Sequence, residues 1–488
     1  MLRIQTLSRT GIYRLVGIAV ILLAYSPGVF RESFWSDDYP YLMDTSGSAN
    51  HVLRDGRPTS AALISMSFSL IKNPSNAWIL RALALIAMLF LFLLVSKKVE
   101  GSVNSPFAIL ATAIALCLPS FQMYIHWSTA WSYMWAALAG MKAFDLWSSN
   151  RRIKKVLAVI LLTLALTTYP PAALVYFSVI VFVNVVNEST SLRIFSETIK
   201  GIWLLVLSLL TSFVVVFAVA QIGGASLNQR VNFVSFSQIP TKISWLVTRP
   251  LVVGLRPFAI DSPAPKIALL TSIPVILILL FGVLRQSKHM NEHVLFRSFA
   301  IVIPLMITLA PIVVSSDNQI EFRILPGYCW GLASLAIFFL LLEIQSRVSK
   351  ATGRAIFGEN AAVTVVVLAS IVAILSVQSH YWALVGNPYQ KKNAFLNGKI
   401  DGCVANRSFS SFVILAPKSP FKSYSRLGIF SMSTDLASEW VPRPSVEVLL
   451  RERGIKAPVS YVAARPLNIL VVKGTCMIDL EEFRKSLG

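Results

Sequence analysis

The stretch "AWILRALALIAMLFLFLLVSKK", Ala77 to Lys98, decides the class of fold. Its apolar run is about as long as the 20 residues that a helix needs to cross a bilayer, and two lysines follow it directly. The whole chain is as apolar in composition as this stretch suggests. Of its 488 residues, 55% are hydrophobic and 14% are charged, whereas soluble domains have about 25% charged residues. We therefore predict an α-helical polytopic membrane protein. About eleven runs of this kind predict membrane spans, at residues 12–30, 77–96, 105–120, 129–147, 156–168, 172–186, 201–222, 267–284, 298–314, 328–343 and 361–377.

Lysine and arginine residues gather in every second loop between these runs. They are Arg3, Arg9, Arg14, Lys97, Lys98, Arg151, Arg152, Lys154, Lys155, Arg193, Lys200, Arg285, Lys288, Arg297, Arg347, Lys350 and Arg354. The positive-inside rule places these loops and the N-terminus in the cytoplasm. This topology accounts for much of the net charge of +21, and no nucleic-acid-binding fingerprint accompanies it. We expect the lipid bilayer as a partner and no nucleic acid.

The intervening loops then lie on the outer side of the membrane, among them residues 31–76 and 223–266. The weakest assignment is the segment 156–186, where "LTTYPPAALVY" fits either one kinked helix or two short helices. Two helices that meet at Tyr169-Pro170-Pro171 are preferred, because an odd total keeps every later basic loop inside. Residues 1–377 are predicted to form the transmembrane domain.

Residues 378–488 are predicted to form a small extracytoplasmic α/β domain. "SSFVILAP" and "LNILVVK" are typical of buried strands, and "SVEVLLRERG" is typical of an amphipathic helix that ends at a glycine. The only cysteines of this domain are Cys403 and Cys476. In an oxidising compartment we expect them to form a disulfide, and the alternative is two buried free thiols.

The outer loop that follows the first span contains "FWSDDYPYL", Phe34 to Leu42, with the adjacent carboxylates Asp37 and Asp38. The surrounding tryptophan and tyrosines are interfacial residues that hold such a segment at the headgroup level. A carboxylate pair in partly desolvated surroundings can keep one group able to accept a proton near neutral pH. The alternative is an acidic loop that is simply solvated.

Three further motifs in the outer loops carry fixed charges. "LRDGRPTS" contains Asp55 and Arg57, "NQIEFRILPGY" contains Glu321 and Arg323, and "TRPLVVGLRPF" contains Arg249 and Arg256. Arginine holds a phosphate through two parallel hydrogen bonds and keeps its charge. The alternatives are an ordinary turn around Gly56 and arginines that snorkel to lipid headgroups.

Aromatic residues lie at the predicted outer turn between the third and fourth spans, where Trp127 and Trp131 could stack on sugar rings. We assign them and Tyr169 to a substrate cavity together with Asp55 and Glu321. An aromatic belt at the membrane interface explains the tryptophans as well. The sequence contains no P-loop, zinc site, nucleophile elbow or dinucleotide fingerprint, so no cofactor is predicted; a divalent metal on the acidic pair stays open.

Together these features resemble the GT-C class of integral-membrane glycosyltransferases. Within that class the chain resembles the Gtr type-two family of phage serotype-converting O-antigen glucosyltransferases, on "FWSDDYPYL", "DGRPTS", "TTYPP" and "EFRILPGYCW". The resemblance implies a polyprenyl-phosphate sugar donor, undecaprenyl-phosphate glucose in particular. It also implies a polysaccharide or lipid-linked O-antigen acceptor, at the periplasmic face of the bacterial inner membrane.

From the site chemistry we expect inverting transfer by direct displacement. Asp37 or Asp38 would accept the proton of the acceptor hydroxyl. Arg323 would stabilise the departing lipid phosphate, helped by Arg57, Arg249 or Arg256. Two rival functions share the predicted spans, namely a flippase or transporter for lipid-linked sugars and an O-antigen polymerase.

Overall fold

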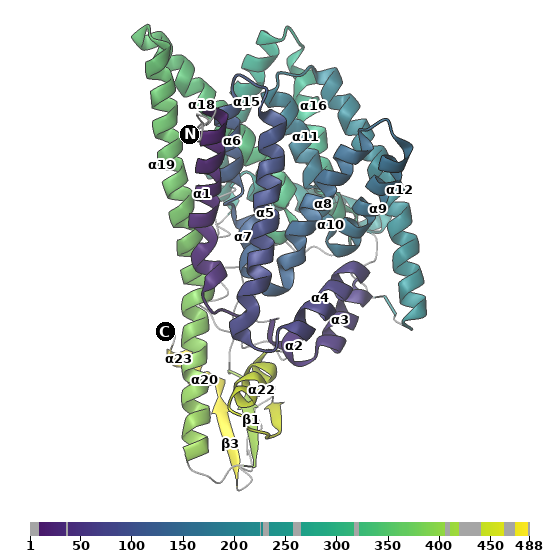
Figure 1. Cartoon of the computed structure of the whole chain (residues 1–488), viewed down its shortest axis with the longest axis vertical. Coiled ribbons are helices and arrows are strands. Elements are labelled where there is room, and N and C mark those ends of the chain that lie inside the picture. Colours follow the sequence, from purple (N-terminus) through teal and green to yellow (C-terminus); the bar gives the residue numbers. More distant parts are fainter. Residues whose placement is uncertain are drawn as a thin grey trace, which may run out of the picture.

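A long helical bundle stands on a small α/β part in the computed structural model of the chain (Figure 1). The structure describes residues 9–35, 38–224, 226–227, 234–256, 265–316, 322–405, 410–418, 441–462 and 474–486. The helices up to the middle of the chain are α1 Arg9–Phe30, α2 Asp38–Met43, α3 Thr45–Arg54, α4 Pro58–Leu70, η1 Pro74–Ala77, α5 Trp78–Val99, α6 Ser105–Ala115, α7 Pro119–His126, η2 Ser128–Ala130, α8 Trp131–Trp147, α9 Arg152–Thr168, α10 Pro170–Ala173, α11 Val175–Val186 and α12 Ser191–Ile222.

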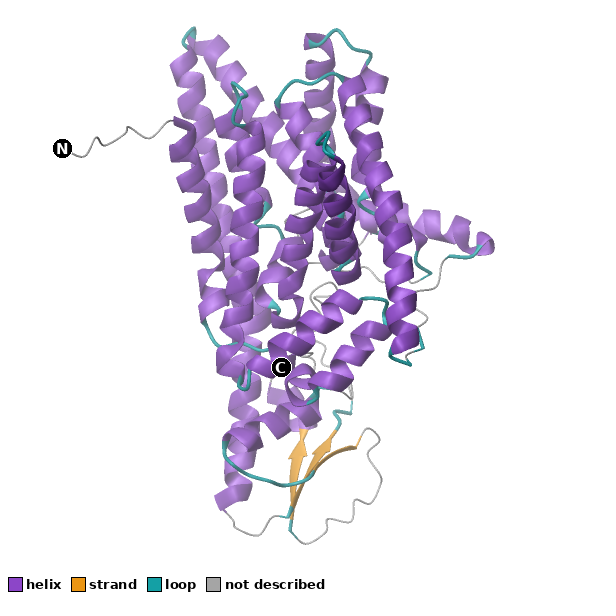
Figure 2. Ribbon diagram, turned by 45° about the vertical axis from the view of Figure 1, so that its right-hand side comes forward, coloured by secondary structure: helices purple, strands orange, loops and turns teal. Residues whose placement is uncertain are grey.

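The remaining elements end in the only strands of the described residues. They are η4 Phe236–Gln238, α13 Ile239–Thr248, α14 Pro250–Gly254, α15 Pro265–His289, α16 Val294–Ile307, α17 Ala310–Val314, η5 Phe322–Ile324, α18 Pro326–Thr352, α19 Ala355–Tyr381, η6 Trp382–Gly386, α20 Asn387–Ala405, β1 Ser411–Leu415, α22 Pro442–Glu452, β2 Val459–Val462, β3 Thr475–Asp479 and α23 Leu480–Ser486. Helix predominates by far, as Figure 2 shows.

Several helices are long and apolar enough to cross a membrane. Five meet this condition among the described residues, and a sixth is obtained if α6 and α7, bent by 59° at their junction, are taken together. The five are Thr10–Phe30, Pro74–Val99, Ser191–Ile222, Pro326–Thr352 and Ala355–Ala405. This is the architecture of a helical membrane protein. The other predicted runs form helices that are shorter, less apolar or interrupted, so length and hydropathy alone support five or six spans rather than eleven.

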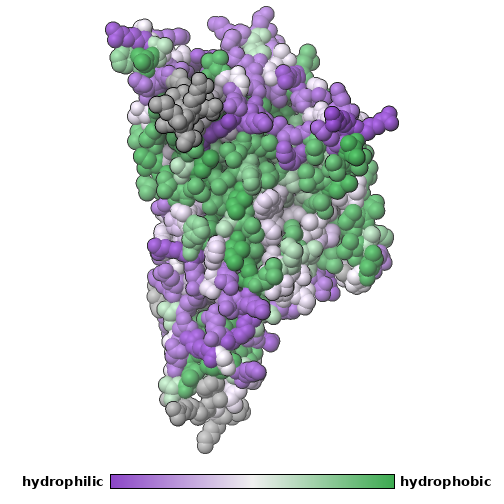
Figure 3. Space-filling model, viewed as in Figure 1, coloured by the Kyte–Doolittle hydropathy of each residue, from purple (hydrophilic) through white to green (hydrophobic). Residues whose placement is uncertain are grey.

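The bundle exposes apolar side chains where a water-soluble protein would not. On the face shown in Figure 3, hydrophobic residues form a broad band with hydrophilic residues beyond it at both ends. Helix α12 exposes large apolar residues along much of its length, including Leu210 at 63% and Phe213 at 69%. Contiguous exposed apolar surface of this kind is expected to face lipid.

The loops that the sequence marks as basic meet at one end of the bundle. Lys98 pairs with Asp145 at 2.5 Å, and Asn187 donates a hydrogen bond to the Lys98 carbonyl at 3.3 Å. Arg14 pairs with Glu100 at 2.8 Å, which adds the start of α1 to the same end. Because α9 leaves this end and α11 returns to it, the segment 156–186 forms two helices that meet at Tyr169, as preferred from the sequence.

The C-terminal part is a three-stranded parallel sheet with the strand order β2-β1-β3. The predicted strand "SSFVILAP" is confirmed as β1, and the predicted helix is confirmed as α22, after which Gly454 has a φ of +70°. The predicted strand "LNILVVK", residues 467–473, lies outside the described residues. A core cluster joins the sheet to α20 through Leu396 and Ile400.

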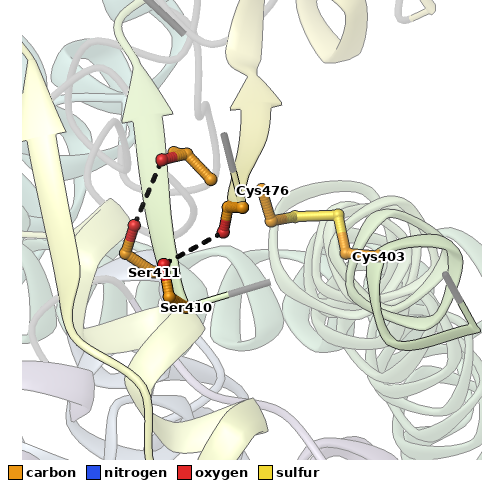
Figure 4. Close-up of a disulfide and its surroundings, with 6 residues drawn as sticks. Cys403, Ser410, Ser411 and Cys476 are labelled. Atoms are coloured by element: carbon orange, nitrogen blue, oxygen red, sulfur yellow. Dashed lines mark hydrogen bonds between the residues drawn. A yellow bond between two sulfur atoms is a disulfide. The ribbon is translucent and has the colours of Figure 1, made fainter. Parts of the chain in front are cut away.

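The predicted disulfide between Cys403 and Cys476 is confirmed, with 5.8 Å between the Cα atoms (Figure 4). It joins the last turns of α20 to β3. Helices α19 and α20 follow one another through the π-helical turn η6, so 51 residues, Ala355–Ala405, run almost without a break. At 1.5 Å per residue this segment measures about 76 Å, more than twice the hydrocarbon thickness of a bilayer, and α20 therefore extends beyond the membrane into the C-terminal part.

Candidate functional site

Asp38 is the first residue of helix α2, and its side chain is completely buried. One carboxylate oxygen accepts a hydrogen bond from the backbone N–H of Trp35 at 2.9 Å. The other accepts from the backbone N–H of Thr129 at 3.0 Å. Asp38 therefore ties the first outer loop to the turn before α8, and the solvated-loop alternative is wrong for this residue. Asp37 lies outside the described residues.

A stacked tryptophan pair connects Asp38 with the predicted phosphate ligand. Trp35 lies on Trp127 with ring centroids 5.5 Å apart and an interplanar angle of 12°. The guanidinium carbon of Arg323 lies 4.9 Å from the centre of the Trp127 ring. The Arg323 carbonyl accepts a hydrogen bond from the hydroxyl of Tyr124. Three segments that are remote in the chain thus meet at the turn before α8.

A tyrosine cluster extends this arrangement to the second acidic motif. Tyr133 stacks on Tyr169 with centroids 3.8 Å apart, and Tyr124 meets Tyr133 edge-on at 5.4 Å. Arg57 donates to the Tyr133 hydroxyl at 3.2 Å and pairs with Asp55 at 2.6 Å. Asp55, Arg57 and Tyr169 therefore belong to the same cluster of contacts as Tyr124 and Tyr133. The charge of Arg57 is balanced by Asp55.

The outer tryptophans are buried in protein and do not face lipid. Trp127 is 5% exposed and Trp131 is 7% exposed, so the aromatic-belt alternative is wrong for both. The indole N–H groups of Trp35, Trp127 and Trp131 have no hydrogen-bond partner within the described part of the protein. Indole is a donor only, so such a group calls for an acceptor oxygen. Sugar hydroxyls and phosphates carry acceptors of this kind.

Among the described residues, Arg249 of the loop 223–266 has no hydrogen bond, ion pair or ring contact with this site. Arg249 is exposed at the junction of α13 and α14, and Arg256 is partly buried just beyond α14. Helix α14 does pack on the start of α18, because a Cβ atom on Gly254 would lie 2.1 Å from the Tyr328 ring. Glu321 lies outside the described residues.

Sequence reasoning missed Arg81, which holds the first outer loop in place. Its guanidinium is buried and donates to the carbonyls of Val29 at 3.3 Å, Arg31 at 2.7 Å and Ser33 at 2.6 Å. These carbonyls lie at the end of α1, where helical carbonyls lack partners within the helix. One charged residue inside an apolar run is the signal that could have revealed it.

Lys392 of α20 was also missed. It is completely buried, and its ammonium nitrogen lies 4.0 Å from the centre of the Tyr39 ring and 5.7 Å from that of Tyr389. Burial lowers the pKa of Lys392 to about 7, an effect that the charge of Asp38 partly opposes. The signal was the spacing of Lys392, Leu396 and Ile400, which share one helix face.

Two cavities lie at the opposite, basic end of the bundle. One of about 390 Å³ is lined by the Lys98–Asp145 pair together with Arg193 and Glu197. Another of about 520 Å³ lies between α15 and α18, beside Arg285. Neither is lined by a predicted site residue.

Within the described residues, no group of three or more His, Cys, Asp or Glu side chains could hold a metal ion. The divalent metal considered for the acidic pair stays a prediction, because Asp37 lies outside those residues. In comparisons with known proteins, no family model matches the chain and no curated protein matches it. The function is therefore argued from the site itself.

Proposed function

We propose that the protein is an inverting glycosyltransferase that uses a polyprenyl-phosphate-linked sugar, glucose in particular. The acceptor is a hydroxyl of a surface polysaccharide or lipid-linked O-antigen repeat. The proposal includes a GT-C-like membrane domain with eleven crossings, an N-terminus in the cytoplasm and the site at the periplasmic face of the bacterial inner membrane. The basic loops that meet at one end of the bundle support this orientation.

One observation carries the proposal: a buried carboxylate, a stacked tryptophan pair and an arginine form one continuous set of contacts. They come from the first outer loop, the turn before α8 and the short helix η5 that precedes α18. A sugar offers apolar ring faces and many acceptor oxygens, which suit tryptophan faces and unpartnered indole N–H groups. A lipid phosphate is stabilised by a cation that stays protonated, and the arginine side chain is such a cation.

The reaction forms one bond and breaks one bond at the anomeric carbon. The acceptor oxygen attacks that carbon, its proton passes to a carboxylate of the acidic pair, and the bond to the phosphate oxygen breaks. The bonding electrons leave with the lipid phosphate, whose negative charge rises as it departs. Arg323 stabilises that charge, and this stabilisation grows toward the transition state.

The two aspartates have different roles in this mechanism. Both oxygens of Asp38 accept backbone N–H groups, so Asp38 serves to position the loop. Asp37 is then the carboxylate that we propose as the general base. A positioned base of this type contributes about 10²–10⁴-fold to the rate.

The test is a transfer assay with the purified full chain in detergent or nanodiscs. It is incubated with undecaprenyl-phosphate glucose and a lipid-linked O-antigen acceptor, and the products are separated by mass. A glucosylated acceptor is the expected result. An elongated polymer would support the polymerase, and lipid movement across vesicles without either product would support the flippase. Either of these outcomes would overturn the proposal.

A further inference from the structure

Lys392 is a buried charge that takes no part in the proposed mechanism. It lies on α20, in the part of the chain that follows the last apolar helix, and packs against the first outer loop. Among the described residues its ammonium group makes no hydrogen bond and no ion pair with a carboxylate. Its near neighbours are the ring faces of Tyr39 and Tyr389.

A buried ammonium group in this setting is costly. Burial removes its water, and a cation without a hydrogen-bonded counter-group opposes folding. The aromatic faces recover part of the loss, since a desolvated cation over a ring gains about 2 kcal/mol. A methionine of similar length would fill the same space without that penalty. The ammonium group is therefore better explained by a ligand than by packing.

The chemistry of that ligand follows from the group itself. An ammonium offers three hydrogen-bond donors and no acceptor, so its complement is an anion with several oxygens. Asp38 lies close enough to influence Lys392 electrostatically, and Asp38 also binds the Trp35 backbone. Trp35 in turn stacks on Trp127, which lies beside Arg323. Lys392 and Arg323 thus lie at the two ends of one set of contacts.

We propose that Lys392 binds the phosphate of the lipid-linked sugar donor, so that the C-terminal part of the chain supplies a residue of the donor site. This inference rests on the proposed function and deepens it, because it makes the transmembrane bundle incomplete as a binding site. The phosphate of the lipid carries several acceptor oxygens and a negative charge, which suit the compact charge and three donors of the Lys392 ammonium group.

Access to Lys392 requires α20 to move away from α2. Polar contacts hold these segments together, namely Tyr39 to Asn393 at 3.4 Å and Tyr389 to Glu32 at 2.7 Å. Arg451 of α22 adds a hydrogen bond to the Lys72 carbonyl at 2.9 Å. Tyr389 of α20 and Val448 of α22 also pack in the apolar core of the bundle, so this movement separates apolar as well as polar contacts.

The test compares Lys392→Met with Lys391→Met in the full chain. Lys391 is the adjacent residue on the same helix and is exposed, so it matches the charge change without the burial. Binding of undecaprenyl phosphate in nanodiscs is followed by quenching of tryptophan fluorescence, with undecaprenol and phosphatidylglycerol as comparison lipids. Apparent Tm is measured for each variant without added lipid.

We expect Lys392→Met to weaken binding of undecaprenyl phosphate by about tenfold or more, the loss typical of one charge-assisted hydrogen bond. Binding of undecaprenol should not change, and the apparent Tm should rise because a buried charge is removed. Lys391→Met should leave all three quantities unchanged.

Other outcomes overturn the inference in distinguishable ways. Equal binding by Lys392→Met and the wild type would show that Lys392 does not meet the phosphate, with the proposed function intact. A lower Tm accompanied by lost binding would make Lys392 a structural residue. Equal weakening for phosphatidylglycerol would make it a site for ordinary lipid headgroups. If the wild type itself fails to bind undecaprenyl phosphate, the proposed function falls, and this inference falls with it.

Discussion

The proposed roles of the adjacent residues Asp37 and Asp38 can be distinguished by experiment. Asp38→Asn keeps one acceptor oxygen and turns an NH₂ group toward a backbone N–H, so at least one buried hydrogen bond is lost. We expect a loss of about 1–3 kcal/mol in the free energy of unfolding. Asp37→Asn should instead lower turnover by about 10²–10⁴-fold and leave the apparent Tm unchanged.

Each variant serves as the control for the other, since the chemical change is identical. Turnover is measured with undecaprenyl-phosphate glucose, and unfolding is followed by thermal denaturation in detergent. A fully stable Asp38→Asn variant without activity would make Asp38 the base and reverse the assignment of roles. Normal turnover of both variants would remove the acidic pair from the mechanism.

Arg323 combines a charge with a planar hydrogen-bonding group, and two substitutions separate these properties. Arg323→Lys keeps the charge, so turnover should fall without vanishing. Arg323→Ala removes both, and a loss of about tenfold or more in turnover should follow for each lost charge-assisted hydrogen bond. Acceptor titrations at saturating donor measure the effect.

Arg249→Ala is the matched control for Arg323, because Arg249 is exposed and has no contact with the site among the described residues. Its turnover should stay near that of the wild type. If Arg323→Ala changes only the apparent acceptor constant, the arginine binds polysaccharide. Another cation must then meet the phosphate.

The lowered pKa of the buried Lys392 predicts that the free energy of unfolding depends on pH. Its pKa is about 7 in the folded protein, against an ordinary value of 10.5. Between these values the unfolded chain holds a proton that the folded chain lacks, so stability rises with pH by up to about 1.4 kcal/mol per unit. Below about pH 7 Lys392 is protonated in both the folded and the unfolded chain, so the full cost of burying its charge opposes folding.

Thermal denaturation from pH 7 to pH 9 measures this contribution. Lys392→Met should be more stable than the wild type at pH 7, and its advantage should shrink as the pH rises. Lys391→Met should follow the wild type throughout. Parallel pH profiles for Lys392→Met and the wild type would contradict a buried lysine of low pKa.

At the scale of elements, one arginine joins the end of α1 to the start of α5. Arg81→Ala would remove this donor from the buried carbonyls of Val29 and Ser33 and from the partly buried carbonyl of Arg31. Each unsatisfied buried group costs about 1–3 kcal/mol, so we expect a total loss of about 3 kcal/mol or more and a large fall in Tm.

The control for Arg81 is Arg31→Ala. The Arg31 side chain is exposed and lies over the Trp382 ring at 4.5 Å, so its removal should cost less than about 1 kcal/mol. Equal Tm values for Arg81→Ala and the wild type would show that water can replace the guanidinium and that the loop does not depend on it.

At the scale of the whole molecule, the orientation in the membrane can be tested directly. The basic loops that meet at one end of the bundle predict that the opposite end, with the C-terminal part, faces outward. A reporter that is active only in the cytoplasm, fused after Gly488, should therefore stay inactive. The same reporter fused after Lys98 should be active.

An active reporter after Gly488 would mean an even number of crossings. Every outer motif would then lie on the wrong side for a periplasmic donor site. The disulfide between Cys403 and Cys476 agrees with an oxidising compartment, since such bonds are rare in the cytoplasm.

The features that depend on local composition could be predicted from the amino-acid sequence. Long apolar runs predicted helices, and basic loops predicted which helix ends lie together. The break at Tyr169, the strand β1 and the pairing of Cys403 with Cys476 were also predictable. In each case the signal lies in a few neighbouring residues or, for the cysteines, in the absence of any other candidate.

Which charges are paired, and which are buried without a counter-charge, follows from how the helices pack. Both oxygens of Asp38 are bound by backbone groups, Arg57 is balanced by Asp55, and Lys392 is buried against Tyr39. These facts depend on contacts between segments that are remote in the chain. Burial changes the cost of a charge far more than its residue type does, and burial follows from how the helices pack together.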